Sequence, residues 1–282
     1  MEKGYIIVSP DKKWNAEISA FHGGNVIRLQ YCQKDVLVPL KSKEQLEQNP
    51  FIIGCPLLFP ANRTYKGEFE FEGKKYSLPI NEPATNSHLH GSLYAQQFET
   101  EEITPGKIVL AFKNTGEIYP FYFRILIEYM VDNNGFYQKI VIKNTGNTNM
   151  PYTFGLHTTF VEPAVFSAPI ELCQERDKHF LPTGRYISLD FKEQQYVKGV
   201  NSKDNVVSGC YKSSGNTVCI DKFEYSVSSN FDHWMLYNGG GESGFLCAEP
   251  QCGAVNGLNL PYGHKILKPN AQETFYTKIT VR

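Results

Sequence analysis

Three side chains far apart along the chain are of the types that carry acid–base chemistry near neutral pH: His90, His157 and Glu249. An imidazole or a carboxylate whose pKa lies near the working pH can take a proton from a substrate or donate one to it. Pro250 restricts Glu249 to extended backbone, and the amide of Gln251 is expected on the same face. Taken singly, each of these residues is more often structural than functional, so the interpretation depends on what brings them together.

His88 and His90 would point to the same face of an extended segment. A metal site built on His-x-His also needs a carboxylate four or five residues later, but Tyr94 and Ala95 hold those positions, and the next acid is Glu99. We therefore expect no metal. Two interpretations stay open: histidines hydrogen-bonded within a loop, or a sugar-binding or acid–base role.

Composition and missing motifs narrow the classes of function. The 28 basic and 29 acidic residues leave a formal charge of -1, and no run of Lys or Arg indicates nucleic-acid binding. The longest apolar stretch, 51–61, is interrupted by Gly and Pro, and the first residues contain no apolar signal region, so no membrane association is expected. Neither a P-loop nor a G-x-S-x-G motif is present.

The seven cysteines are odd in number and scattered, which favours reduced thiols and a cytoplasmic location over a disulfide framework. Cys247 and Cys252 form an isolated C-x4-C pair, so a structural zinc site is not expected.

Strand signals run through most of the chain, and turn clusters rich in Gly and Asn separate them. The strands predicted with the clearest patterns cover 69–71, 75–78, 121–131, 136–144 and 274–282, while only 41–48 is typical of a helix. No linker or repeat divides the sequence. We therefore expect an all-β fold, a large antiparallel β-sandwich forming one domain over residues 1–282.

With these motifs in place, the sequence resembles the aldose 1-epimerase (galactose mutarotase) family over nearly its whole length. The resemblance rests on fragments that follow one another in the family's order: 21–24, 34–39, 54–63, 89–91, 155–157, 182–184, 249–251 and 264–269. It implies a galactose mutarotase-like supersandwich with an open sugar cleft, no metal and no cofactor. One departure is Ser92, which replaces a second Gly after His90-Gly91, so the loop shape and the preferred sugar are expected to differ.

The resemblance also implies roles for individual residues. Glu249 matches the general base, His157 the general acid and His90 the second imidazole of the site. The sugar-contacting residues it implies are Asn62, Arg63, Gln251 and, where the flanking sequence matches poorly, Asp204.

The function that the resemblance implies is interconversion of the α and β anomers of a free aldohexose, with Glu249 ionised and His157 protonated in the resting site. A hexose-6-phosphate 1-epimerase would need further cations at the cleft mouth, and Arg176 and the other arginines outside the motifs are expected elsewhere. A non-catalytic carbohydrate-binding protein of the same fold is the other alternative. A polysaccharide hydrolase or lyase would require a second carboxylate beside Glu249, and none is evident. We expect a small sugar as the partner and a monomer or homodimer.

Overall fold

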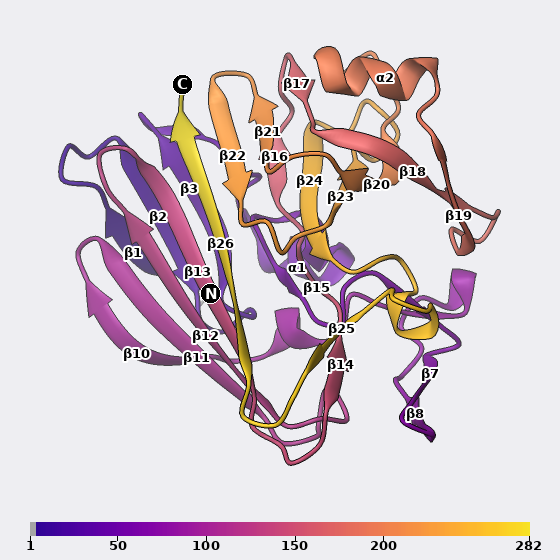
Figure 1. Cartoon of the computed structure of the whole chain (residues 1–282). Coiled ribbons are helices and arrows are strands. Elements are labelled where there is room, and N and C mark those ends of the chain that lie inside the picture. Colours follow the sequence, from indigo (N-terminus) through magenta and orange to yellow (C-terminus); the bar gives the residue numbers. More distant parts are fainter. Residues whose placement is uncertain (1–3) are drawn as a thin grey trace.

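The computed structural model describes residues 4–282, so the first three residues of the predicted domain, where we expect no signal region, lie outside the described part. Two large sheets form two layers (Figure 1), and every pairing between strands of these sheets is antiparallel. The all-β sandwich expected from the sequence is confirmed.

The first large sheet has eight strands. In spatial order they are β10 (Glu99–Thr104), β11 (Lys107–Asn114), β12 (Phe123–Val131), β13 (Gly135–Asn144), β26 (Gln272–Val281), β22 (Phe223–Val227), β21 (Thr217–Ile220) and β17 (Phe166–Ser167). The hairpin predicted at 121–144 and the final strand predicted at 274–282 are β12, β13 and β26, with ends shifted by a few residues.

The second large sheet carries the candidate site. Its strands, in spatial order, are β19 (Pro182–Ser188), β18 (Ile170–Arg176), β20 (Ser208–Ser213), β23 (His233–Tyr237), β24 (Phe245–Cys252), β15 (Phe154–Leu156) and β5 (Leu57–Leu58), and β16 (Thr159–Val161) also pairs with β24.

Smaller sheets complete the fold. One holds β1 (Tyr5–Val8), β2 (Trp14–Ser19), β3 (Asn25–Tyr31) and β4 (Lys34–Asp35), and three are pairs: β6 (Arg63–Tyr65) with β9 (Ser87–Leu89), β7 (Glu68–Phe71) with β8 (Lys74–Ser77), and β14 (Met150–Tyr152) with β25 (Lys265–Leu267). The hairpin predicted around residues 69–78 is β7–β8.

Aromatic side chains join the two large sheets. Phe154 on β15 packs on Phe275 of β26 with ring centroids 4.8 Å apart, and Tyr225 on β22 meets Trp234 of β23 at 5.9 Å. Complete burial of a large apolar side chain contributes about 1.5–3 kcal/mol. Period-2 burial along β12, where Phe123, Ile125 and Ile127 are all buried, gives the first sheet its inward face. This core holds the second sheet, which carries the candidate site, against the first.

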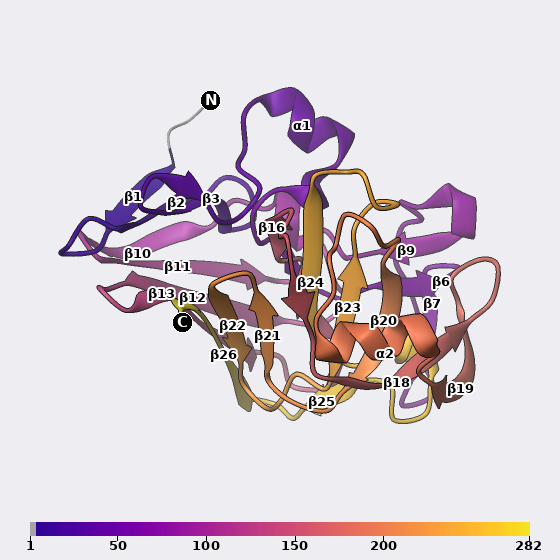
Figure 2. The same ribbon diagram turned by 90° about the horizontal axis from the view of Figure 1, so that it is seen from above.

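Residues 4–282 form two α-helices, whereas the sequence analysis predicted one. The predicted helix at 41–48 is α1 (Lys43–Gln48). The second, α2 (Phe191–Lys198), begins at a capping box in which the Asp190 carboxylate accepts from the Glu193 amide and Glu193 accepts from the Asp190 amide. Tyr196 packs on Phe166 of β17. The two helices lie at different edges of the sandwich (Figure 2), and no helix of the described residues is long and apolar enough to cross a membrane.

Candidate active site

A cavity of about 340 Å³, here called the polar cavity, opens on the face of the second sheet turned away from the main core. It gathers side chains from β6, β18, β20, β23 and β24 and from the loops before β5 and after β9 and β15. Its lining residues are Asn49, Phe51, Ile52, Asn62, Arg63, Glu82, Leu89, His90, His157, Arg176, Phe180, Ser208, Met235, Tyr237 and Glu249. The three acid–base residues predicted from the sequence therefore come together in one cavity.

Strand alternation places Glu249. Leu246 and Ala248 of β24 belong to the main core, so Glu249 and Gln251 lie on the opposite face, as expected. Glu249 is only 2 % exposed. Its Oε2 accepts a hydrogen bond from Gln251 Nε2 at 3.1 Å, and Gln251 Oε1 accepts from Asn62 Nδ2 at 3.3 Å. Gln251 is fully buried and does not line the cavity, so its position suits orienting the Glu249 carboxylate. Asn62, in contrast, lines the cavity.

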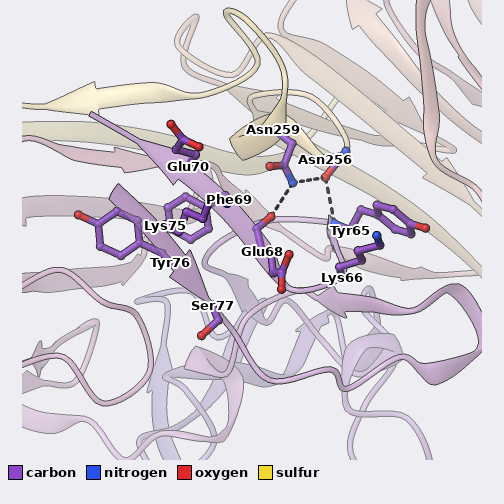
Figure 3. Close-up of a pocket in the computed structure, with 10 residues that line it drawn as sticks. All are labelled: Tyr65, Lys66, Glu68, Phe69, Glu70, Lys75, Tyr76, Ser77, Asn256 and Asn259. Atoms are coloured by element: carbon purple, nitrogen blue, oxygen red, sulfur yellow. Dashed lines mark hydrogen bonds between the residues drawn. The ribbon is translucent and has the colours of Figure 1, made fainter. Parts of the chain in front are cut away.

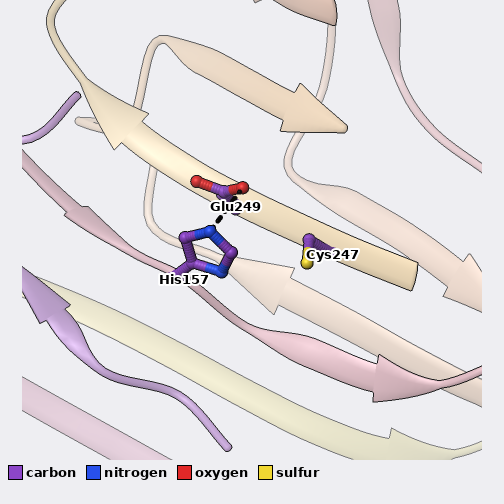
Figure 4. A group of neighbouring side chains, drawn as sticks. All are labelled: His157, Cys247 and Glu249. Carbon is purple, nitrogen blue, oxygen red and sulfur yellow. Dashed lines mark ion pairs between the residues drawn. The ribbon is translucent and has the colours of Figure 1, made fainter. Parts of the chain in front are cut away.

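His157 directly follows β15 and faces Glu249 (Figure 4). Its amide donates to Pro56 O, which anchors the turn out of the strand, and its Nε2 lies 3.3 Å from Glu249 Oε1. Phe51 stacks on the imidazole with a centroid separation of 5.9 Å and an interplanar angle of 29°. Phe51 therefore covers one face of the imidazole, while Nε2 points at the carboxylate.

His90 enters the cavity because β9 ends at Leu89. His90 adopts a left-handed backbone with φ 63°, and Gly91 follows at φ 69°, where a Cβ would meet Phe59 O at 1.8 Å. His90 Nδ1 accepts from the backbone N–H of Asn62 at 3.3 Å, so a neutral imidazole carries its proton on Nε2. His90 is thereby prepared to donate a hydrogen bond from Nε2.

The expectation that His88 and His90 share a face is wrong, since the left-handed residue breaks the alternation. His88 is fully buried, its Nδ1 contacts Pro79 O at 2.6 Å, and it does not line the polar cavity. It lies in the pairing of β9 with β6, opposite Thr64.

Burial pushes the facing pair toward its neutral forms. It raises the pKa of Glu249 to about 8 and lowers the pKa of His157 to about 4. Burial, reinforced by the nearby His157, also holds the pKa of His90 well below its usual value. At pH 7 these shifts favour a protonated Glu249 and a neutral His157, whereas the sequence analysis expected the ionised pair. In both arrangements, neutral or ionised, Glu249 and His157 hold one titratable proton between them.

Arg63 lines the cavity but is held by a residue that the sequence analysis missed. Its Nε and Nη2 donate to the two carboxylate oxygens of Glu82 at 2.7 and 2.6 Å, a bidentate pair. The guanidinium also lies 5.3 Å from the ring centroid of Phe180. Glu82 and Phe180 belong to none of the quoted motifs, so only the folded chain reveals them.

Arg176 and Asp204 differ from their expected positions. Arg176, at the end of β18, lines the polar cavity because the β18–β19 hairpin brings it beside Ser208, whose carbonyl accepts from Nη2 at 2.8 Å. No carboxylate of the described residues lies within ion-pair distance of it. Asp204 is exposed in the turn before β20 and does not line the polar cavity. The cavity residue nearest to it in the sequence is Ser208.

His157, Cys247 and Glu249 could together offer three ligand atoms to a metal ion, since these atoms lie within 4.8 Å of one another (Figure 4). The Cys247 thiol contacts Thr159 Oγ1 at 3.5 Å, and burial raises its pKa well above the usual value. A thiolate, not a thiol, is the form that binds zinc. The donor set therefore fits a metal poorly, and the absence of a metal stays a prediction.

A larger cavity of about 530 Å³ lies beside the β7–β8 hairpin (Figure 3). Two of its polar side chains bond to their neighbours: Asn259 Nδ2 donates to Glu68 O and to Asn256 Oδ1, which also accepts from the Tyr65 amide. Its lining residues include no imidazole and no buried carboxylate, so the acid–base chemistry belongs to the polar cavity.

The fold and the site together define a galactose mutarotase-like β-sandwich with a buried glutamate and two histidines in one cavity. The chain belongs to the aldose 1-epimerase family, because the family model described as Aldose 1-epimerase matches residues 6–280. Membership implies an isomerase of carbohydrate metabolism.

Comparisons with individual proteins agree with this fold. The structure matches a galactose mutarotase-like protein from Clostridium acetobutylicum with a TM-score of 0.89 and 21 % identity, covering 100 % of this chain and 99 % of that one. It matches a putative aldose 1-epimerase from Escherichia coli K12 with a TM-score of 0.86 and 16 % identity, covering 99 % of this chain and 98 % of that one. In sequence, 169 residues are 27 % identical to the uncharacterized protein YihR of Escherichia coli K12, spanning 57 % of this chain and 54 % of that protein.

Proposed function

We propose that this protein is an aldose 1-epimerase that interconverts the α and β anomers of a free aldohexose. The observation that supports it most strongly is the contact of 3.3 Å between His157 Nε2 and Glu249 Oε1 inside the polar cavity. The pKa shifts of the pair favour one titratable proton between the two groups at neutral pH, and anomerisation needs one group to accept a proton while another donates one.

The reaction balances with these two side chains. In the reactive arrangement Glu249 is a carboxylate and His157 an imidazolium. Glu249 takes the proton of the C1 hydroxyl, the bond between C1 and the ring oxygen breaks, and His157 protonates that oxygen. Rotation about C1–C2 presents the other face of the aldehyde, and both proton transfers reverse as the ring closes. No nucleophile or cofactor takes part in this scheme.

The surrounding residues orient the pair and the sugar. Gln251 and Asn62 hold the Glu249 carboxylate in place through their hydrogen-bond chain. The His90 Nε2 proton is available to a ring or hydroxyl oxygen, and the Arg63–Glu82 pair offers both donors and acceptors to further hydroxyls. Buried polar groups of this kind discriminate between sugars that differ in one hydroxyl.

The direct test follows the optical rotation of freshly dissolved α-D-glucose and α-D-galactose, together with anomer-exchange NMR over a dozen free and phosphorylated aldoses. We expect faster equilibration than the spontaneous rate for at least one free aldohexose. Sugar binding without acceleration of any aldose would instead identify a non-catalytic carbohydrate-binding protein.

The shared proton predicts a bell-shaped pH dependence of kcat/KM. Below about 4 both His157 and Glu249 hold protons and no base remains, whereas above about 8 neither holds one and no acid remains. Activity should therefore be greatest between these values. Polarimetry from pH 3 to 10, corrected for buffer-catalysed anomerisation, measures the profile, and a rate that keeps rising beyond pH 9 contradicts the shared-proton scheme.

A second candidate function is favoured by Arg176. The guanidinium reaches the polar cavity without a carboxylate partner, and it could hold an anionic group such as the phosphate of a hexose 6-phosphate. Sequence reasoning placed this arginine elsewhere, and its position in the cavity removes the main argument against a charged substrate.

Replacing Arg176 with Gln separates the two candidates. If the cavity takes a phosphorylated sugar, we expect kcat/KM for glucose 6-phosphate to fall by about 10–100-fold, since hydrogen bonds to charged groups contribute about 1.5–3 kcal/mol. The value for glucose should change by less than about threefold. Arg185→Gln, which alters an exposed arginine paired with Glu175, is the matched control. Equal effects on both sugars leave the free aldohexose as the substrate.

A further inference from the structure

Five polar side chains, here called the interlayer network, are buried between the two large sheets. The members are Cys55, Gln138, Thr158, Tyr225 and Thr277, each at most 3 % exposed. Period-2 alternation turns Gln138 of β13, Tyr225 of β22 and Thr277 of β26 inward from the first sheet. Cys55 and Thr158 reach them from the segments just before β5 and β16. Burial of a polar group is costly unless it finds a hydrogen-bond partner, so these groups need one another.

Hydrogen-bond contacts join the five side chains across the two layers. Thr158 Oγ1 lies 2.8 Å from the Tyr225 hydroxyl and 3.2 Å from Cys55 Sγ. Cys55 Sγ in turn lies 3.8 Å from Gln138 Oε1, which accepts a hydrogen bond from Thr277 Oγ1 at 2.7 Å. The side chain of Thr158 is thus tied to the first sheet directly through Tyr225 and indirectly through Cys55.

The backbone of Thr158 places this network directly behind the acid–base pair. Thr158 follows His157 in the gap of two residues between β15 and β16. Its side chain points to the core, whereas that of His157 enters the polar cavity and faces Glu249 (Figure 4). The Thr158 carbonyl accepts from the amide of Ala248, which precedes Glu249, at 2.9 Å. A shift of Thr158 would therefore move both members of the pair.

Cys55 supports the same segment from the neighbouring chain. The carbonyls on either side of it, those of Gly54 and Pro56, accept from the Thr159 amide at 2.9 Å and from the His157 amide at 3.0 Å. The backbone that carries the catalytic imidazole is therefore bonded to the residues that flank Cys55. The contact of the Cys55 sulfur with the interlayer network anchors this second support to the first sheet.

We propose that Thr158 is a positioning residue whose hydroxyl, held by Tyr225 and Cys55, sets the contact of 3.3 Å between His157 Nε2 and Glu249 Oε1. The proposal rests on the proposed aldose 1-epimerase function. Both groups of the pair must reach the same sugar, and misplacement of a reacting group by about 1 Å can lower a rate about 100-fold. None of the five residues of the interlayer network lines the polar cavity, so sugar binding should not depend on them.

The test separates the hydroxyl of Thr158 from its volume. Thr158→Val removes the hydroxyl at nearly constant volume, and we expect it and Tyr225→Phe each to lower kcat about tenfold with KM within about twofold. Thr158→Ser keeps the hydroxyl and loses a methyl group, so its Tm should fall while kcat stays within about threefold of wild type. Tyr119→Phe is the matched control, because this buried hydroxyl donates to Pro151 O outside the network. Equal losses of kcat in Thr158→Val and Thr158→Ser, or a loss carried by KM, would overturn the proposal.

Nitrogen NMR of the histidine rings separates failure of this proposal from failure of the proposed function, because it requires no turnover. The His157 signals are assigned by their absence in His157→Asn. We expect their chemical shifts and pH titration to change in Thr158→Val and Tyr225→Phe and to match the wild-type protein in Thr158→Ser and Tyr119→Phe. This result in a protein that anomerises no aldose supports the positioning role alone. His157 signals that neither Thr158→Val nor Tyr225→Phe alters overturn it, whatever the activity.

Discussion

Glu249→Gln should lower kcat for anomerisation by about 10³–10⁴-fold, near the upper end of what one positioned acid–base group contributes. The amide cannot accept the C1 proton, yet it keeps the shape of the side chain. Its carbonyl can still accept from Gln251 Nε2, and its NH₂ can donate to His157 Nε2, which lies 3.3 Å from Glu249 Oε1. The fold should therefore survive, and polarimetry measures the loss. Glu70→Gln, on an exposed face of β7, is the control.

The same variant should be more stable than the wild-type protein at alkaline pH. Burial raises the pKa of Glu249 from 4.5 to about 8, so the folded state binds this proton more tightly than the unfolded state. The resulting stability is complete below pH 4.5 and is lost as the pH rises through about 8. The amide of the variant is neutral at every pH, so the variant loses no stability at this position as the pH rises. Thermal unfolding should give similar Tm values at pH 5 and a higher Tm for the variant at pH 9. A lower Tm for the variant at both pH values contradicts the buried-carboxyl account.

His157→Asn should lower kcat by about 10²–10³-fold, because the ring oxygen loses its proton donor. The pH profile should also change in form. Without the shared proton, Glu249 acts alone and must be ionised, so the residual rate should rise through about pH 8, where the wild-type rate falls. His157→Gln tests whether side-chain volume matters, and His179→Asn alters an exposed histidine outside the cavity as a control. Activity within a few-fold of wild type in both His157 variants would contradict the proposed mechanism.

Much of the fold could be predicted because it depends on local patterns. The alternation along 121–144, with a turn at its centre, is sufficient to predict β12 and β13. The same period places Glu249 and Gln251 on one face of β24. The helix α2 was missed although its signal was present, since Asp190 and Glu193 have capping-box spacing. The single domain over residues 1–282 stays a prediction.

The sequence by itself determined which residues could carry the chemistry, because His90, His157 and Glu249 stand in ordered motifs of one family. Only the tertiary structure decided their state and surroundings. It turned His90 into the cavity and His88 away through one left-handed residue, and it buried the pair so that neutral forms are favoured. It also brought Arg176 to the cavity and left Asp204 outside. Local spacing sets the direction of a side chain along a strand, whereas burial and long-range contacts arise only when distant strands pack.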